Sequence, residues 1–357
     1  MTKTILRLTL SGIFLVLTGF LVLISYLLPS FFFSFYPDFS RSMMQIIGGA
    51  TSIVPFAVCE ICAILLIALF IFTLVRAIMK TRIVRWLAGL LLVVSVGVFA
   101  FVSLWGLNYY APPMAERLGM QEQQFTAEQL KQAAEYYRDM ANLTAKNVER
   151  NSDGSMKAYD FDALAQSAGE GFDILAEDFD CFSGSTVRVK SLLCSPLMGK
   201  IGMTGGFICL TGEACVSSST YRAAMPFTMC HEIGHRMAFA REDEANFAAF
   251  LACSVSERPE FAYSGYYMAF LYCYNALYKV DAAGAAKVWA GVGDELAADC
   301  GAATKHYEEV RSDAAAEVAD SVYSGYLNAF SVESGTQSYG EVADLLILWY
   351  YERGNLT

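Results

Sequence analysis

Three apolar stretches near the start of the chain constrain its fold more than any other feature of the sequence. They run from Leu8 to about Leu28, from Ile53 to Val75 and from Trp86 to Leu107. A helix needs about 20 apolar residues to cross a bilayer, and each stretch is long enough. Lys3 and Arg7 precede the first, as in a secretory signal peptide, but no small-residue cleavage site follows it. We therefore expect three retained transmembrane helices, with the lipid bilayer as a partner.

Basic residues predict how these helices are oriented. The link between the second and third stretches carries four bases and no acid, namely Arg76, Lys80, Arg82 and Arg85. The opposite loop, at about 29–52, has Arg41 as its one base. Because short cytoplasmic loops carry an excess of Lys and Arg, we expect the N-terminus and the basic loop to be cytoplasmic. Residues 108–357 should then form an extracytoplasmic domain.

The net charge also differs between the membrane segment and the rest of the chain. Residues 1–107 hold seven bases and two acids, and the total of −11 leaves −16 for residues 108–357. An acidic domain lacks the basic footprint that nucleic-acid binding requires, so we expect no nucleic-acid partner. We predict two parts, a three-helix membrane anchor over 1–107 and a domain of another kind over 108–357.

The second part reads as α-rich with a small β-sheet. Thr126 and Gln129 have the spacing of a capping box, which predicts a helix reaching about Glu149. Further helices are expected over 159–179 and 339–353. Residues 186–190 alternate as in a strand, within a Val-, Thr- and Gly-rich segment that extends from 181 to 219.

The chain has three histidines, and two of them belong to the sequence His231-Glu232-Ile233-Gly234-His235. At positions i and i+4 of a helix both imidazoles project from one face, so both can bind one zinc ion. Glu232 is placed to accept a proton from a metal-bound water. The motif predicts a zinc-dependent hydrolase with Zn²⁺ as cofactor, and a structural helix with hydrogen-bonded histidines is the alternative.

A catalytic zinc ion requires a third protein ligand. His306, the remaining histidine, lies far along the chain, whereas Glu242, Asp243 and Glu244 follow the motif closely. Glu244 stands where a charged segment becomes an apolar helix, and a buried carboxylate there needs a partner. We expect Glu244 to be the third ligand, and Glu242, which lies on the turn itself, is the fallback. The alternative is that these acids only favour the N-terminus of a helix, without any metal.

Six stretches carry a resemblance to a known family: 104–110, 211–214, 226–235, 240–247, 263–266 and 338–340. Over nearly its full length the chain resembles the bacterial membrane proteins grouped as domain of unknown function 3810. This resemblance implies a bacterial cell-membrane protein with a three-helix anchor and a zincin-like domain, without a known substrate. Residues 244–249 are also similar to the third-ligand helix of ImmA/IrrE-type metallopeptidases, which favours Glu244.

Other residues are weaker candidates for the site. Glu213 lies in a strand-like segment upstream of the motif, where a substrate backbone could pair, although an acid in such a turn is more often solvated. Tyr263, Tyr266 and His306 are candidates for the group that stabilises an oxyanion. Ten cysteines fit either a disulfide framework or buried free thiols, and the sequence does not decide between them.

These observations together predict three transmembrane α-helices followed by an α-rich α+β zincin-like domain with a small β-sheet. The expected function is zinc-dependent hydrolysis of an extracytoplasmic peptide or protein. A non-catalytic sensor or scaffold of the same fold is one alternative, and retention of Glu232 speaks against it. A hydrolase of cell-wall peptide amides is the other, and nothing in the sequence separates it from a protease.

Overall fold

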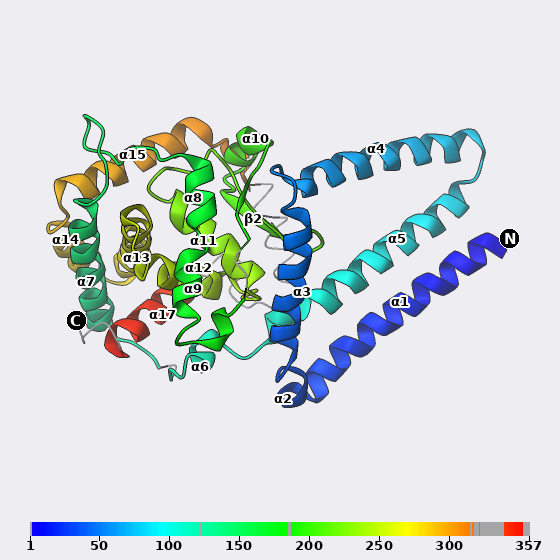
Figure 1. Ribbon diagram of the computed structural model, residues 1–357, viewed down its shortest axis with the longest axis horizontal. Helices are drawn as coiled ribbons and strands as arrows, with labels where there is room; N and C mark the ends of the chain where they lie inside the picture. Colours follow the sequence, from blue (N-terminus) through cyan, green and yellow to red (C-terminus); the bar gives the residue numbers. More distant parts are fainter. Residues whose placement is uncertain are drawn as a thin grey trace. The chain divides into compact units, whose positions relative to one another are not determined.

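The computed structural model describes residues 2–121, 123–184, 187–314, 316–317, 321 and 339–352. Most of these residues are helical, and the chain forms two compact units. The first unit consists of Met1–Ala111 together with Ile208–Glu213, and the second of Pro112–Phe207 together with Ala214–Thr357 (Figure 1). The boundary after residue 111 lies close to the predicted one, whereas the inclusion of 208–213 in the first unit was not predicted.

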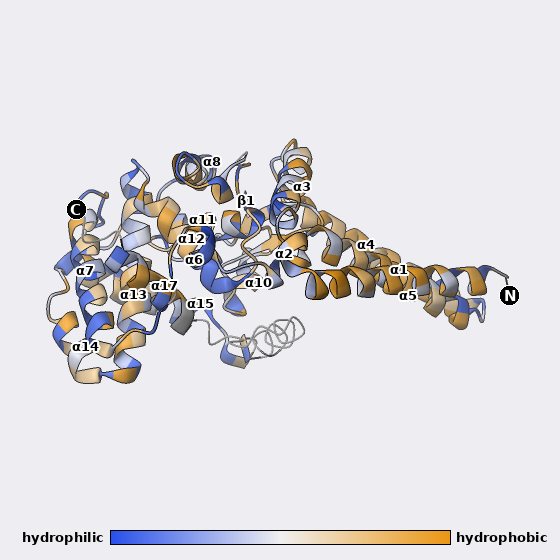
Figure 2. Ribbon diagram, turned by 90° about the horizontal axis from the view of Figure 1, so that it is seen from below, coloured by the Kyte–Doolittle hydropathy of each residue, from blue (hydrophilic) through white to orange (hydrophobic). Residues whose placement is uncertain are grey.

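Three long helices dominate the first unit: α1 (Thr2–Leu27), α4 (Val58–Met79) and α5 (Ile83–Leu104). All three are long and apolar enough to cross a membrane (Figure 2). Their side chains are mostly exposed. Helices α1 and α5 pack along each other, and Arg7 donates a hydrogen bond to the carbonyl of Arg85 at 2.8 Å. Three apolar helices at the predicted places suggest a membrane anchor, and the orientation stays a prediction.

The segment at about 29–52, which connects the first two apolar stretches, is helical. It forms α2 (Pro29–Phe32) and α3 (Tyr36–Thr51), which follow α1 directly. The hydroxyl of Tyr36 donates to the carbonyl of Val102 at 3.0 Å, and that of Ser40 donates to the carbonyl of Leu104 at 2.8 Å. These bonds hold α3 against the end of α5, where the chain passes into the 3₁₀ turn η1 (Gly106–Tyr110). This helix contains Pro37 and the Gly48-Gly49 pair, residues that are more common in loops than in helices.

The tip of a β-turn completes the first unit. Gly212 has a φ of +62°, and a Cβ atom there would lie 2.4 Å from the backbone nitrogen of Gly48 in α3. Next to it, the two carboxylate oxygens of Glu213 accept hydrogen bonds from the backbone of Val58 at 2.8 Å and of Cys59 at 2.7 Å. Glu213 therefore caps the N-terminus of α4, where the helix dipole favours an anion.

The second unit is a helical domain with a small sheet. Its longer helices are α7 (Ala127–Ala145), α11 (Met225–Arg236), α12 (Glu242–Ser254), α13 (Pro259–Val280), α14 (Ala282–Trp289), α15 (Asp294–Val310) and α17 (Tyr339–Glu352). Short helices are α6 (Met114–Arg117), α8 (Phe161–Ser167), α9 (Glu170–Leu175), η2 (Asp180–Phe182) and α10 (Ser195–Lys200). The capping box of Thr126 is present, which confirms the predicted start of α7.

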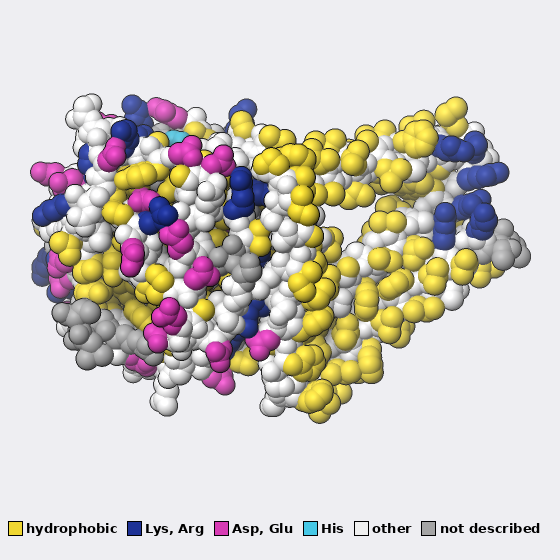
Figure 3. All heavy atoms as spheres, in the orientation of Figure 1, with side chains coloured by type: hydrophobic (Ala, Val, Ile, Leu, Met, Phe, Trp, Pro, Cys, Tyr) yellow, Lys and Arg dark blue, Asp and Glu magenta, His cyan; other side chains and the backbone are white. Residues whose placement is uncertain are grey.

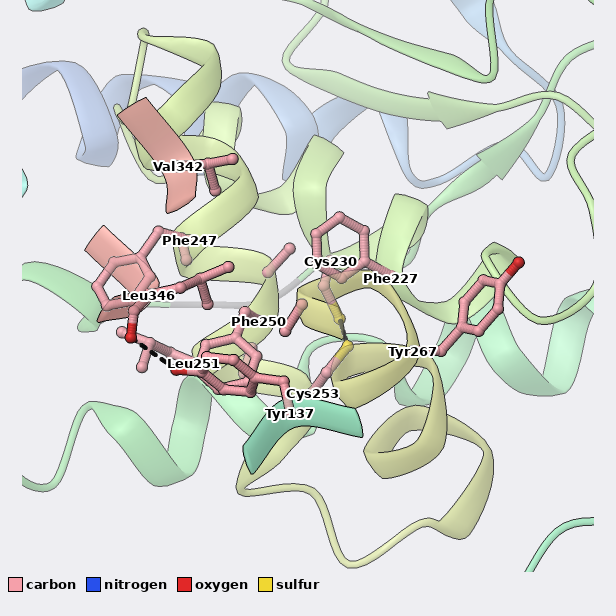
Figure 4. Close-up of a cluster of buried hydrophobic side chains, with 14 of the residues drawn as sticks. Tyr137, Phe227, Cys230, Phe247, Phe250, Leu251, Cys253, Tyr267, Val342 and Leu346 are labelled. Atoms are coloured by element: carbon pink, nitrogen blue, oxygen red, sulfur yellow. Dashed lines mark hydrogen bonds between the residues drawn. The ribbon is translucent and has the colours of Figure 1, made fainter. Parts of the chain in front are cut away.

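Helix α12 lies in the middle of this domain. It packs against α11, α13, α9 and α17, and the run from Ala245 to Cys253 is almost wholly buried. Figure 4 shows part of this core, where the hydroxyl of Tyr137 donates to the carbonyl of Leu346 at 2.8 Å. Gly171 of α9 allows the close packing, because a Cβ atom there would lie 2.0 Å from the carbonyl oxygen of Ala252. The predicted single helix at 159–179 is instead the pair α8 and α9.

Three short strands form a small mixed sheet in the order β1-β3-β2. They are β1 (Lys190–Ser191), β2 (Gly205–Ile208) and β3 (Glu213–Val216), and β1 pairs with β3 in parallel. The predicted strand at 186–190 is present only at its end, because 187–189 are not in a strand and Thr186 lies outside the described residues. Strand β2 is an edge of the sheet.

All ten cysteines are free thiols. The closest approach is between Cys230 of α11 and Cys253 of α12, whose sulfur atoms lie 3.6 Å apart in the core (Figure 4). The structure therefore favours the free-thiol reading of the sequence over a disulfide framework.

Candidate metal centre

The two motif histidines lie on α11, one helical turn apart. Pro226 stands in the first turn of the helix, where its missing N–H removes no hydrogen bond. The imidazole rings of His231 and His235 are 4.6 Å apart between their centres, with planes nearly perpendicular. The short distance from His235 to the next charged segment predicts that this helix ends soon after Met237. It ends at Arg236, and Ala238, with a φ of +71°, turns the chain back. A new helix, α12, begins at Glu242.

Close packing of α11 and α12 brings a carboxylate to the histidines. Gly234 faces α12, and a Cβ atom there would lie 3.3 Å from the carbonyl oxygen of Ala245. The oxygens of Glu242 then lie 3.3 Å from Nε2 of His231 and 3.5 Å from Nε2 of His235. These three residues form a group whose ligand atoms all lie within 4.8 Å of one another and could hold a metal ion.

Glu244, the predicted third ligand, is not part of this group. Its carboxylate accepts a hydrogen bond from the backbone nitrogen of Met114 at 2.6 Å and forms an ion pair with Arg241. Residues two apart on a helix point about 200° apart, so Glu242 and Glu244 cannot face the same point. In this structure Glu242, which the sequence offered only as the fallback, faces the two histidines, and Glu244 does not. Burial of Glu244 was predicted correctly, but protein groups rather than a metal neutralise it.

His235 is held by a hydrogen bond between Nδ1 and the carbonyl of Phe239 at 2.8 Å, which directs Nε2 towards Glu242. Burial lowers the pKa of His235, but the neighbouring Glu242 carboxylate outweighs it and raises the pKa to about 9. The pKa of Glu242 lies well below its usual value despite burial, because both imidazoles stabilise the carboxylate. His235 therefore favours its protonated, positively charged form, and Glu242 favours its ionised, negatively charged form.

Glu232 lies beside the histidines and is 4% exposed. Burial raises its pKa to about 7, although the two histidines oppose the rise. Within the described residues its Oε2 atom has no hydrogen-bond partner, and the same holds for Nδ1 of His231. Buried polar atoms without partners cost about 1–3 kcal/mol each, so a water or another group is expected to satisfy them.

Strand β2 crosses directly over Glu232. A Cβ atom on Gly205 would lie 2.4 Å from Oε1 of Glu232 and 2.9 Å from the carbonyl oxygen of Cys215. Only glycine leaves room for the carboxylate at this point. The edge strand and the acidic side chain are therefore adjacent, a relationship that the sequence indicated only as a strand upstream of the motif.

The remaining candidates from the sequence are engaged elsewhere. Glu213 caps α4, as described above, and is not available to a substrate. The hydroxyl of Tyr263 is buried and donates to Asp299 at 2.6 Å. The ring of Tyr266 packs edge-on against Phe250, and Nε2 of His306 hydrogen-bonds to the carbonyl of Ser219 at 2.7 Å. The structure places none of them in the group of His231, His235 and Glu242.

A family model described as protein of unknown function (DUF3810) matches residues 35–347. This range covers most of the chain and includes both α11 and α12. The chain belongs to the DUF3810 family. No curated protein and no solved structure matches it. Membership of DUF3810 confirms the family that the sequence resembled and assigns no activity to it.

Proposed function

We propose that this DUF3810 protein is a membrane-anchored zinc metallopeptidase with a zincin-like catalytic domain. The observation that carries the proposal is the convergence of His231, His235 and Glu242 beside a buried Glu232. Two imidazoles and one carboxylate form the ligand set of several catalytic zinc sites, which keep a fourth position open for water or substrate.

The spacing of the donor atoms fits zinc. Bonds of about 2.0–2.1 Å in a tetrahedral site separate the ligand atoms by about 3.3–3.4 Å. Oε2 of Glu242 lies 3.3 Å from Nε2 of His231 and Oε1 lies 3.5 Å from Nε2 of His235, so each imidazole has a carboxylate oxygen at about that separation. The hydrogen bond between Nδ1 of His235 and the carbonyl of Phe239 orients the ring so that Nε2 faces the proposed metal position, as the outer-shell partner of a metal-binding histidine commonly does.

A bound zinc ion would supply a water of lowered pKa and polarise the scissile carbonyl. The protein then has to move a proton, and Glu232 is the residue placed for it. Burial raises the pKa of this carboxyl, which suits a group that accepts a proton and later returns it to the leaving amine. Its Oε2 atom, which has no partner among the described residues, can hold that proton. Glu232 is thus the general base of the proposed reaction.

An extended peptide is the substrate that the surroundings favour. Strand β2 is an edge of the sheet and crosses Glu232 at Gly205, where no side chain intervenes. A peptide added to this edge would run past the carboxylate with its backbone paired to β2, which is the β-augmentation mode of recognition. The same pairing suits the peptide stems of cell walls, so both substrate types belong in the test.

The experiment uses the full-length protein in detergent or nanodiscs. Zinc content is measured by elemental mass spectrometry, and hydrolysis is followed with a mixed peptide library and with cell-wall stem peptides. Glu232→Gln should keep zinc and lose hydrolysis, since the residue acts on water without ligating the metal. Glu257→Gln, at an exposed turn, is the matched control and should change neither.

A protein that binds zinc and cleaves equally well with Gln at 232 would refute the mechanism. Zinc without any cleavage by the wild type would favour a sensor or scaffold.

A further inference from the structure

Helix α3 presents an apolar stripe to its surroundings. Within the helix the stripe consists of Phe39, Ile46 and Ala50, and exposed Phe35 just before α3 and exposed Ile53 just after it extend the apolar surface at the two ends. Steps of seven and four residues place Phe39, Ile46 and Ala50 on one face of the helix. Ile46 is 65% exposed and Ile53 85% exposed, which is far more than a water-facing helix of a soluble domain normally shows for such residues.

The opposite face of α3 is fixed within its own unit. Tyr36 and Ser40 hydrogen-bond to carbonyls at the end of α5, and Asn108 donates to the hydroxyl of Ser40 at 2.7 Å. Met44 and Gly48 are buried and receive the backbone at Gly212. The stripe is therefore the face of α3 that stays exposed among the described residues of the first unit. Because the opposite face is fixed, the helix cannot rotate to bury the stripe.

Charge is almost absent from this helix. Asp38 and Arg41 are its two charged residues, and they pair with each other at 2.9 Å. The Arg41 side chain is 8% exposed, which leaves Asp38 at the edge of the apolar face as the one well-exposed charge of α3. A surface for a charged protein partner would carry complementary charges at its rim. This surface instead resembles the lipid-facing sides of α1, α4 and α5.

The position of α3 within the first unit points to the bilayer. It connects the end of α1 to the start of α4 and packs at the end of α5. It thus lies at the opposite end of the three long helices from the basic loop of residues 80–82, where Lys and Arg side chains gather (Figure 3). Hydrophobic side chains continue from the three helices along α3 in the same view.

We propose that α3 is an interfacial helix, which lies along the membrane surface with its apolar stripe inserted between the lipid headgroups and the acyl chains. Helices of this kind bury their apolar face by about 5–10 Å while the other face stays polar or packed. The membrane anchor then consists of three spanning helices and one helix parallel to the surface, on the side of the membrane opposite the basic loop. This assignment does not depend on the proposed enzymatic activity.

The test places an environment-sensitive fluorescent amino acid at position 46 of the full chain in phosphatidylcholine nanodiscs. Tyr278, an exposed aromatic residue at the end of α13, is the matched control position. Lipids with brominated acyl chains should quench position 46 several-fold more than position 278, whereas aqueous iodide should quench mainly position 278. The same label at Ile53 repeats the measurement if the first variant is produced poorly.

Equal iodide quenching at positions 46 and 278, without quenching by brominated lipid, would overturn the proposal. Protection of position 46 from both quenchers would also overturn it. That result would show that protein covers the stripe, either a second copy of this chain or another membrane protein.

Discussion

Glu242 and Glu244 stand two residues apart on α12, and their carboxylates serve different partners. Glu242 faces the Nε2 atoms of both motif histidines, whereas Glu244 accepts the backbone N–H of Met114 and pairs with Arg241. One carboxylate therefore faces the proposed metal position, and the other holds the first residue of α6 and the residue before α12. The two residues are a matched pair for separating ligation from positioning.

Glu242→Gln should lower zinc affinity by more than the roughly 10–100-fold that loss of an outer-shell partner causes. Glu244→Gln should leave zinc affinity within that range, because its carboxylate does not reach the histidines. It should instead lower the free energy of unfolding by about 1–3 kcal/mol, since Arg241 loses a buried charged partner. Competition titrations with a zinc chelator and chemical denaturation measure the two effects. A larger loss of zinc affinity in Glu244→Gln than in Glu242→Gln would restore the assignment made from sequence.

The sequence could predict those parts of the site that depend on local periodicity. Two histidines four residues apart share a helix face wherever the helix lies, and the end of α11 near Met237 followed from the short distance to the next charged segment. The acidic residue that faces the two histidines could not be predicted in this way. Its direction depends on the turn at Ala238, a non-glycine residue with positive φ, and on where the first turn of α12 begins.

Long-range contacts account for the other differences. Glu213 looked like a solvated acid because the nitrogen atoms it binds, in Val58 and Cys59, are more than 150 residues earlier in the chain. Helix α3 lies in the segment at 29–52 that was identified only as the connection opposite the basic loop, and its secondary structure was not predicted. In contrast, the three long apolar helices were predictable because length and composition alone indicate them.

Tyr263→Phe should affect stability rather than zinc binding or catalysis. Asp299 is fully buried and accepts hydrogen bonds from Tyr263 at 2.6 Å, Tyr221 at 3.0 Å and the backbone of Met156 at 2.8 Å, and it pairs with Arg150. Removal of one hydrogen bond to a charged acceptor should cost about 1.5–3 kcal/mol of unfolding free energy. Denaturation curves and zinc titrations of the same variant check this. A normal unfolding free energy combined with a large fall in kcat would instead make Tyr263 a candidate for the group that stabilises the oxyanion.

Zinc should stabilise the folded protein. Binding to the native state alone adds about 2.7 kcal/mol when free zinc is 100 times Kd. Thermal unfolding in a chelator and after zinc is restored should therefore differ by several degrees. The variant His231→Ala should lose this shift, whereas Glu257→Gln should keep it. An equal shift in His231→Ala would place the bound zinc elsewhere in the chain.

The orientation of the anchor can be tested without any substrate. Arg76, Lys80, Arg82 and Arg85 predict a cytoplasmic loop between α4 and α5. A short epitope inserted between Lys80 and Thr81 should be protected from protease added to intact cells, and one placed after Thr357 should be digested. Permeabilised cells should lose both epitopes. Digestion of the inserted loop epitope in intact cells would reverse the orientation and move the proposed enzyme to the cytoplasm.

Gly205→Ala should impair catalysis through Glu232 while leaving the metal in place. The added Cβ atom would lie 2.4 Å from Oε1 of Glu232, so the carboxylate must move away from β2. A displaced general base lowers kcat, and misplacement by about 1 Å can cost roughly 100-fold. Gly301→Ala in α15 is the matched control, since a Cβ atom there meets nothing within 4 Å and alanine favours a helix by about 0.5–1 kcal/mol. Zinc content should be unchanged in both variants, which separates an effect on Glu232 from loss of the site. If Gly205→Ala kept the wild-type kcat, either β2 would move away from Glu232 during turnover or Glu232 would not be the base.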